Sequence, residues 1–198
     1  MLGGFFFAEN AGETVVLLRE ACYNKKNCDF SAWKETAMLL DILIPLLGLA
    51  ADQLVKYWAC VRLKPVETVP VIREVFHLTY CENRGAAFSM FSGKRWLLLL
   101  ITAVLLAGIL YAMKKQWVRG GLGRWGLRLI LGGALGNLVD RLLRGYVVDL
   151  FDFRLIHFPI FNVADILLNV GVGLLVVYIL FLEPRLNKKE GDRGAEAS

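Results

Sequence analysis

The stretch "WLLLLITAVLLAGILYAM" (residues 96–113) carries no charged side chain. A helix of about 20 apolar residues crosses the hydrocarbon core of a bilayer, so this stretch predicts a transmembrane helix. The chain has 198 residues, of which 57% are hydrophobic, and its mean hydropathy is +0.52. A soluble domain is closer to half apolar, and here the excess is concentrated in a few blocks. We therefore predict a membrane protein that is mainly α-helical.

Three further apolar blocks flank this stretch, at about residues 39–58, 127–143 and 162–182. Together with residues 96–113 they predict a four-transmembrane-helix bundle within one domain, residues 38–183. Residues 1–37 are mixed and polar, and Met38 would make a sensible start on its own. We interpret residues 1–37 as an N-terminal extension, either poorly ordered or a mis-assigned start. Residues 184–198 form a polar tail.

The connections between the spans predict the topology. The loop of residues 114–128 carries five basic residues and no acidic one, which favours the cytoplasmic side and places both termini there. Residues 61–95, on the outer side, are rich in β-branched and aromatic residues and predict a small β-structure. Residues 144–161 carry aromatic side chains typical of a segment at the outer membrane interface.

The net charge of +5 and the pI of about 9.1 do not indicate a nucleic-acid-binding protein. The basic residues cluster at the ends of apolar blocks, where topology and lipid headgroups explain them. The four cysteines form no CxxC pair, and neither histidine is spaced with them as in a zinc site, so we expect no metal and no cofactor. Cys60 and Cys81 could form a disulfide, but two unpaired cysteines are the favoured interpretation.

Polar residues inside the apolar blocks are the candidates for a site, because a charge in a span costs about 2.5–3.5 kcal/mol on insertion scales. Asn137 and Arg141 share a helix face with Gly133, and Gly132 and Gly136 form a GxxxG pair that favours close helix packing.

Two other spans carry polar residues near the same end. Asn162, Asp165 and Asn169 share a face of the last span. Asp52 and Lys56 are four residues apart, so they form either a local ion pair or part of the site.

Asp149, in the outer connection, returns to the depth of Asp165. Two neighbouring carboxylates tend to share one proton, so that one acts as a general base toward water and the other as a general acid. This is the chemistry of an aspartic peptidase. Two alternatives remain open from the pattern alone: a small transporter with an ion path, and an assembly factor whose polar groups only join helices. Asp140 and Asp152 are further acids nearby, to which we assign secondary positions.

Five blocks of the sequence resemble, in order, the signature blocks of bacterial lipoprotein signal peptidase (signal peptidase II). They are "DQLVK" (residues 52–56), "NRGAAFSMF" (83–91), "GGALGNLVDR" (132–141), "VVDLFDF" (147–153) and "FPIFNVAD" (158–165). The resemblance implies an aspartic endopeptidase that cuts the signal peptide from prolipoproteins, before a cysteine that carries diacylglycerol.

The resemblance also implies residue roles. The catalytic dyad maps onto Asp149 and Asp165. The substrate-binding or supporting residues are Asp52, Lys56, Asn83, Gly85, Asn137, Arg141 and Asn162. We lean toward substrate contact for Asn83. The implied partners are diacylglyceryl-prolipoproteins, membrane lipids and cyclic peptide inhibitors of the globomycin type, and we expect a monomer in the bacterial cytoplasmic membrane.

Overall fold

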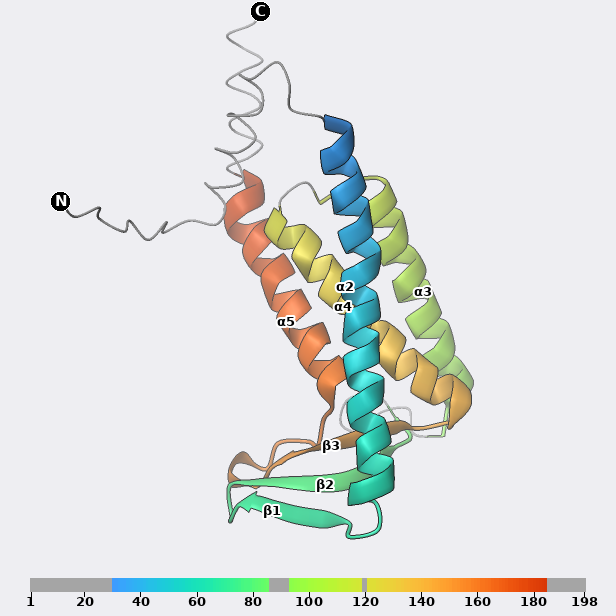
Figure 1. The fold of residues 1–198 in the computed structure, drawn as a ribbon, viewed down its shortest axis with the longest axis vertical. Helices are drawn as coiled ribbons and strands as arrows, with labels where there is room; N and C mark the ends of the chain where they lie inside the picture. The colour runs from blue at the N-terminus through green and yellow to red at the C-terminus, as the bar shows by residue number, and fades with distance from the viewer. Residues whose placement is uncertain (1–29, 86–92, 119–120, 185–198) are drawn as a thin grey trace, which may run out of the picture.

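The computed structural model describes residues 30–85, 93–118 and 121–184. Four long helices form its body: α2 (Phe30–Trp58), α3 (Arg95–Lys114), α4 (Gly121–Leu143) and α5 (Val163–Val177). π-helical turns extend two of them, η1 (Ala59–Leu63) after α2 and η4 (Tyr178–Leu182) after α5. Figure 1 shows a small sheet at one end of these helices, and we call this the sheet end. The opposite end, where α2 and α4 begin, is the far end.

The four helices cover the stretches predicted as spans and are longer at some ends, and the number of spans stays a prediction. α2 begins at Phe30 rather than near residue 39, and α4 begins at Gly121 rather than near residue 127. Residues 1–29 and 185–198 lie outside the described residues, so the extension and the tail stay predictions.

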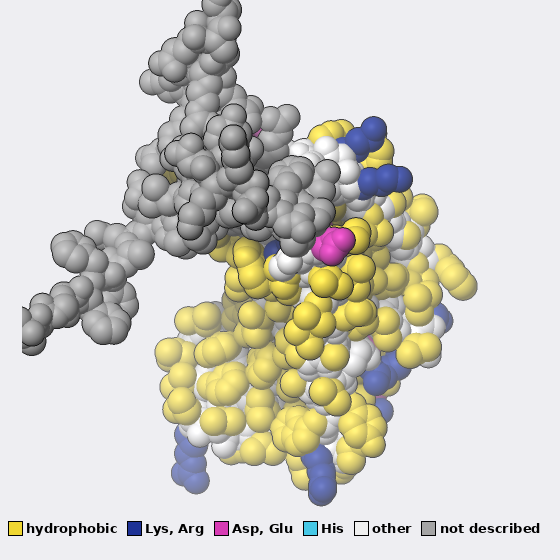
Figure 2. All heavy atoms as spheres, turned by 45° about the horizontal axis from the view of Figure 1, so that its top comes forward, with side chains coloured by type: hydrophobic (Ala, Val, Ile, Leu, Met, Phe, Trp, Pro, Cys, Tyr) yellow, Lys and Arg dark blue, Asp and Glu magenta, His cyan; other side chains and the backbone are white. Residues whose placement is uncertain are grey.

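Within the described residues, three helical stretches are long and apolar enough to cross a membrane: Glu35–Leu63, Arg95–Lys114 and Val163–Leu182. Their surfaces carry many exposed leucine, isoleucine and valine side chains, and Figure 2 shows hydrophobic side chains over most of the visible described surface. A soluble protein rarely exposes so large an apolar surface. The prediction of a mainly helical membrane protein is confirmed. α4 is not among the three stretches, because it is rich in glycine and carries charged residues near both ends.

Glycines let α4 pack directly on its neighbours. A Cβ on Gly132 would lie 3.1 Å from the Pro45 carbonyl oxygen of α2, and a Cβ on Gly133 would lie 2.4 Å from the Ala164 carbonyl oxygen of α5. Gly126 and Gly171 approach in the same way, since a Cβ on either one would lie 2.7 Å from the carbonyl oxygen of the other. Small residues at such contacts allow the close approach that stabilises helix pairs in lipid. The structure therefore supports a packing role for these glycines.

The sheet contains three antiparallel strands in the order β1-β2-β3: β1 (Thr68–Ile72), β2 (Phe76–Asn83) and β3 (Val147–Phe153). The first two lie in residues 61–95, where β-structure was predicted. The third lies in residues 144–161, where we expected only an interfacial segment. β3 is buried along most of its length, so it lacks the polar–apolar alternation that is typical of a half-exposed strand.

The β2–β3 pairing brings residues 144–161 back to the helices. Cys81 pairs with Asp149, and Asn83 pairs with Val147. Val148 and Leu150 pack with Ala59 of η1, and this small core holds the strand against the end of α2. Cys60 and Cys81 are both free.

Candidate active site

Asp149 occupies the middle of β3 and is only 1% exposed. Asp165 lies in the first turn of α5 and is partly exposed. The pKa of the Asp149 carboxyl is raised to about 7, chiefly by burial and next by the nearby negative charge of Asp165. The two acids that sequence position singled out are therefore close enough for the charge of one to affect the other.

Asn162 connects the two acids. It is the N-cap of α5, where its Oδ1 accepts a hydrogen bond from the backbone N–H of Asp165 (2.9 Å) and its own N–H donates to Asp165 Oδ2 (3.3 Å). This reciprocal pair is a capping box. The Nδ2 group of Asn162 donates to Asp149 Oδ1 at 2.6 Å. One residue thus starts the helix that carries Asp165 and also bonds directly to Asp149.

Each acid has a second amide donor. Asn83 Nδ2, from the end of β2, donates to Asp149 Oδ2 at 3.0 Å. Asn137 Nδ2, from α4, donates to Asp165 Oδ1 at 2.8 Å. The expected contact of Asn83 with substrate stays a prediction, and the structure shows what else its amide does.

Gly85 and Arg141 hold Asn83 in place. Asn83 Oδ1 accepts the backbone N–H of Gly85 at 3.0 Å, and Arg141 Nη2 donates to the Gly85 carbonyl oxygen at 2.9 Å. Arg141 therefore ties the end of α4 to the segment that follows β2. Residues 86–92, the rest of the "NRGAAFSMF" block, lie outside the described residues.

Lys56 and Asp52 are both 0% exposed and form an ion pair of 2.8 Å. Lys56 Nζ also donates to Asn137 Oδ1 at 3.0 Å, and Asp52 Oδ1 accepts the backbone N–H of Ala164 at 2.9 Å. The two interpretations of this pair, ion pair or site, are thus compatible. The pair is local to α2, and it also contacts the residues around Asp165.

The structure brings all nine predicted site residues into one connected set at the sheet end of the bundle. Asn169, which shares a helix face with two of them in sequence, is exposed, and its amide donates to the Asp165 carbonyl oxygen of its own helix. The roles of the nine residues in catalysis stay predictions.

Asp140, to which the sequence assigned a secondary position, lies directly behind the site residues. It is 0% exposed, lies 3.0 Å from Lys56 Nζ, and accepts the backbone N–H of Val148 at 3.1 Å. Arg144, one helical turn later, also pairs with it. Its position three residues after Asn137 on α4 was a usable signal, because residues at that spacing share a helix face.

Asp152 lies apart from the acid pair, on the opposite face of β3 from Asp149. It lies three residues after Asp149 in β3, so its side chain points to the opposite face of the strand. Burial raises the pKa of Asp152, but hydrogen bonds from Arg154 (3.0 Å) and Thr79 (2.8 Å) outweigh that effect and hold the pKa below its usual value. Asp152 is an ionised partner of Arg154 rather than a member of the acid pair.

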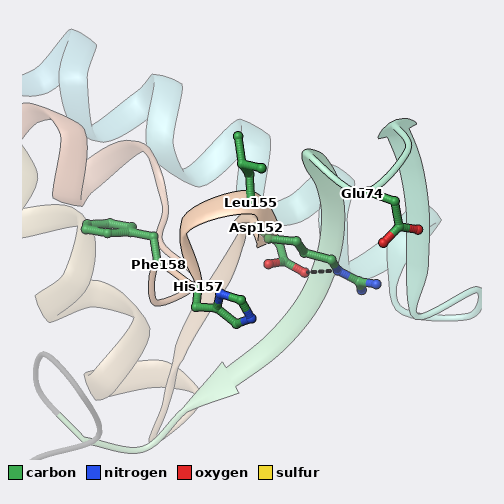
Figure 3. Close-up of a pocket in the computed structure, with 6 residues that line it drawn as sticks. Glu74, Asp152, Leu155, His157 and Phe158 are labelled. Carbon is green, nitrogen blue, oxygen red and sulfur yellow. Dashed lines mark hydrogen bonds and ion pairs between the residues drawn. The ribbon is translucent and has the colours of Figure 1, made fainter.

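An open pocket of about 530 Å³ lies beside Asp152, away from the acid pair. Figure 3 shows Glu74 on the β1–β2 hairpin facing the turn after β3, which carries Leu155, His157 and Phe158. None of the nine predicted site residues lines this pocket. Among the described residues, no group of three or more His, Cys, Asp or Glu side chains is placed to hold a metal ion.

Comparison with known proteins relates this chain to a single family of peptidases. The sequence profile described as signal peptidase (SPase) II matches residues 44–181. A lipoprotein signal peptidase of Clostridioides difficile (strain 630) is 44% identical over 147 residues, which are 74% of this chain and 99% of that protein. A lipoprotein signal peptidase of Brevibacillus brevis (strain 47) is 42% identical over 146 residues, 74% of this chain and 97% of that protein.

A solved structure described as a bacterial membrane enzyme, determined by the in meso method at 2.3 Å resolution, has a similar fold. It superposes with a TM-score of 0.65 and 34% identity, and covers 71% of this chain and 87% of that chain. A second one, at 1.9 Å resolution, gives a TM-score of 0.64, also at 34% identity, over 72% of this chain and 93% of that chain. The chain belongs to the signal peptidase II family.

Proposed function

We propose that the chain removes the signal peptide from diacylglyceryl-modified prolipoproteins by cutting on the amino side of the lipid-modified cysteine, with Asp149 and Asp165 as the catalytic dyad. Family membership makes the chain a peptidase, and its relatives are lipoprotein signal peptidases. The observation that supports this pairing of Asp149 with Asp165 is the contact of Asn162 with both acids. It joins a buried carboxyl whose pKa is raised to about 7 with a carboxyl that is partly exposed.

The environments of the two acids support different roles. Asp149 is the general acid, because burial favours its protonated form near neutral pH. Asp165 is the general base, because it is the more exposed of the two and water can reach it. Two acids in unlike environments, with one proton between them, satisfy the requirements of general acid–base hydrolysis.

The reaction then proceeds without a covalent bond between enzyme and substrate. Asp165 takes a proton from water as the water oxygen attacks the scissile carbonyl carbon, and Asp149 gives its proton to the carbonyl oxygen. The resulting gem-diol collapses as the carbon–nitrogen bond breaks. Asp165 delivers its proton to the leaving amine, and Asp149 recovers a proton from one hydroxyl of the gem-diol. Both acids return to their starting states.

The membrane arrangement supports a lipid-anchored substrate. We propose that α4 crosses the membrane with the other three helices, giving four spans, and that both termini are cytoplasmic. The end of α3 and the first turns of α4 lie at the far end and carry Lys114, Arg124 and Arg128, which supports a cytoplasmic position for that end by the positive-inside rule. The acid pair then lies near the outer surface, where the diacylglyceryl cysteine sits with its acyl chains in the bilayer. Globomycin-type cyclic peptides would compete for the same site, in a protein that acts as a monomer.

A reconstituted cleavage assay tests this function. Purified protein is mixed with a prolipoprotein peptide that carries diacylglycerol on its cysteine, or with the same peptide without lipid, and the products are identified by mass spectrometry. We expect a cut immediately before the lipid-modified cysteine, slow or no cutting of the unlipidated peptide, and no cutting by Asp165→Asn. Cutting at another bond, equal cutting of both peptides, or appreciable cutting by Asp165→Asn would overturn the proposal.

A further inference from the structure

Each acid of the dyad is preceded by a residue whose backbone N–H is held by another, fully buried aspartate. Before Asp165, the N–H of Ala164 donates to Asp52 Oδ1 at 2.9 Å. Before Asp149, the N–H of Val148 donates to Asp140 Oδ2 at 3.1 Å. The two holding aspartates come from different helices, α2 and α4, and both are 0% exposed.

Lys56 joins these two aspartates. Its ammonium lies 2.8 Å from Asp52 Oδ2 and 3.0 Å from Asp140 Oδ2. Its third hydrogen bond, of 3.0 Å, goes to Asn137 Oδ1. A lysine ammonium has three N–H donors, so all of its donors are engaged by three acceptors from two helices.

The third bond also reaches the dyad. An amide oxygen that accepts from Lys56 leaves the Asn137 amide nitrogen to point the other way, and that nitrogen donates to Asp165 Oδ1 at 2.8 Å. Lys56 is therefore connected to Asp165 through Asn137 and Asp52, and to Asp149 through Asp140.

We propose that Asp52, Lys56 and Asp140, here called the clamp triad, set the separation of the two catalytic carboxylates by fixing the strand that carries one and the helix that carries the other. The inference rests on the proposed function, since it assigns positioning roles around the same dyad. The three residues contact one another, two backbone N–H groups and the side chains of Asn137, Gln53 and Arg144, rather than the two acids. They are positioning residues, and Asp140 among them had only a secondary position from the sequence.

Burial holds the three side chains of the clamp triad in fixed positions. A charge without water around it is costly unless it is paired and hydrogen-bonded, so each member of the clamp triad holds the others in place. Gly136 adds a close contact, because a Cβ there would lie 2.5 Å from Asp52 Oδ2 and 3.2 Å from the Ala164 Cβ. The site leaves little room for Asp52 to shift.

The test measures kcat, KM and thermal stability for Asp52→Asn and Asp140→Asn, with the lipidated peptide as substrate. Asparagine keeps the size and one acceptor oxygen but weakens the bond to Lys56. Misplacing a reacting group by about 1 Å can cost on the order of 100-fold in rate, so we expect kcat of the folded enzyme to fall about 10- to 100-fold with KM nearly unchanged. The double variant should lose less than the product of the two single losses, because both act through Lys56.

Two further variants keep the test decisive. Gly136→Ala presses on Asp52 without changing any charge, so it should also lower kcat even if an asparagine variant fails to fold. Asp41→Asn is the matched control: it removes a carboxylate from an ion pair between the same two helices, at the far end. It should lower thermal stability and leave kcat and KM unchanged.

The outcomes separate the two proposals. Wild-type kcat in folded Asp52→Asn, Asp140→Asn and Gly136→Ala, together with inactive Asp149→Asn and Asp165→Asn, would overturn the clamp and leave the proposed function intact. An equal loss of kcat in Asp41→Asn would also overturn the clamp, since it would show a general response to a weakened helix pair. Failure of the wild-type enzyme to cut the lipidated peptide would overturn the proposed function itself.

Discussion

Helices α2 and α4 are joined by ionic contacts at both ends, and the two sets differ in what else they hold. At the sheet end, the clamp triad is fully buried and also holds backbone N–H groups next to both proposed catalytic acids. At the far end, Asp41 is 17% exposed and pairs with Arg124 and Arg128, and Arg128 also donates to the Ala37 carbonyl oxygen. The far-end cluster connects helices to each other, whereas the clamp triad connects helices to the acid pair.

We therefore expect contacts at the far end of this helix pair to affect stability alone, and contacts at the sheet end to affect the placement of the two acids as well. Asp41 and Asp52 are eleven positions apart on α2, which is roughly 16 Å at 1.5 Å per residue. At that distance, and without shared partners, changes at the two ends should add independently. Changes at the far end should alter stability alone, and changes at the sheet end should alter stability and rate together.

Lys56→Met should have the largest effect. It leaves the carboxylates of Asp52 and Asp140 buried without their cation, and removing one partner of a buried ion pair typically costs about 3–5 kcal/mol. We expect a large loss of thermal stability and no measurable cleavage by the fraction that folds. Arg128→Met, at the far end, should cost less because Asp41 keeps Arg124 and is partly exposed. Equal destabilisation by the two variants would contradict the contrast between the ends.

Gly126→Ala should have an intermediate effect that is confined to stability. A Cβ at this position would lie 2.7 Å from the Gly171 carbonyl oxygen and 3.1 Å from the Leu175 backbone nitrogen. Overpacking of this kind costs typically about 1–3 kcal/mol, so a loss of that size is expected in a denaturation assay. Cleavage per folded molecule should stay at the wild-type level, because the contact lies toward the far end. The control is Gly173→Ala, where a Cβ would meet nothing within 4 Å in the described structure. A fall in kcat for Gly126→Ala would argue against independent ends.

Asn162→Ala should have the smallest effect on stability and a specific effect on pH dependence. Losing the N-cap of α5 costs about 1 kcal/mol. With Asp149 as the proposed general acid, cleavage should fall as pH rises through its pKa of about 7. The hydrogen bond from Asn162 lowers that pKa, and its loss should move the alkaline fall to higher pH. A pH–rate profile of wild-type and variant enzyme checks the shift, and a shift to lower pH would contradict the assignment.

Particular residues show how far the sequence alone could reach. The apolar blocks predict the helices, because side chains that face lipid are apolar and form runs of about 20 residues in the sequence. Asp149 and Asp165 could be selected by depth, since each lies near the sheet end of the bundle. Asn137 and Arg141 followed from helical spacing, which brings residues four apart to one face.

Asp140 and β3 show which contacts the sequence alone did not reveal. Helical spacing places Asp140 on the face of Asn137 and one turn before its partner Arg144, but its contacts with the backbone N–H of Val148 and with Lys56 of another helix leave no mark in local spacing. β3 is buried along most of its length, so its sequence lacks the polar–apolar alternation that would mark a half-exposed strand. The Lys56–Asp140 ion pair and the β2–β3 pairing both join elements that are distant in the chain.

Strand β3 carries Asp149, the proposed catalytic acid, and Asp152, which pairs with Arg154, on opposite faces, and the proposed mechanism depends on this difference. The most direct measurement compares Asp149→Asn with Asp152→Asn for cleavage of the lipidated peptide, with folding of each variant checked by thermal denaturation in the same detergent. We expect a folded Asp149→Asn with no detectable cleavage and a folded Asp152→Asn that cuts at close to the wild-type rate. Appreciable cleavage by Asp149→Asn, or an equal loss in both variants, would contradict the assignment of Asp149 as the catalytic acid.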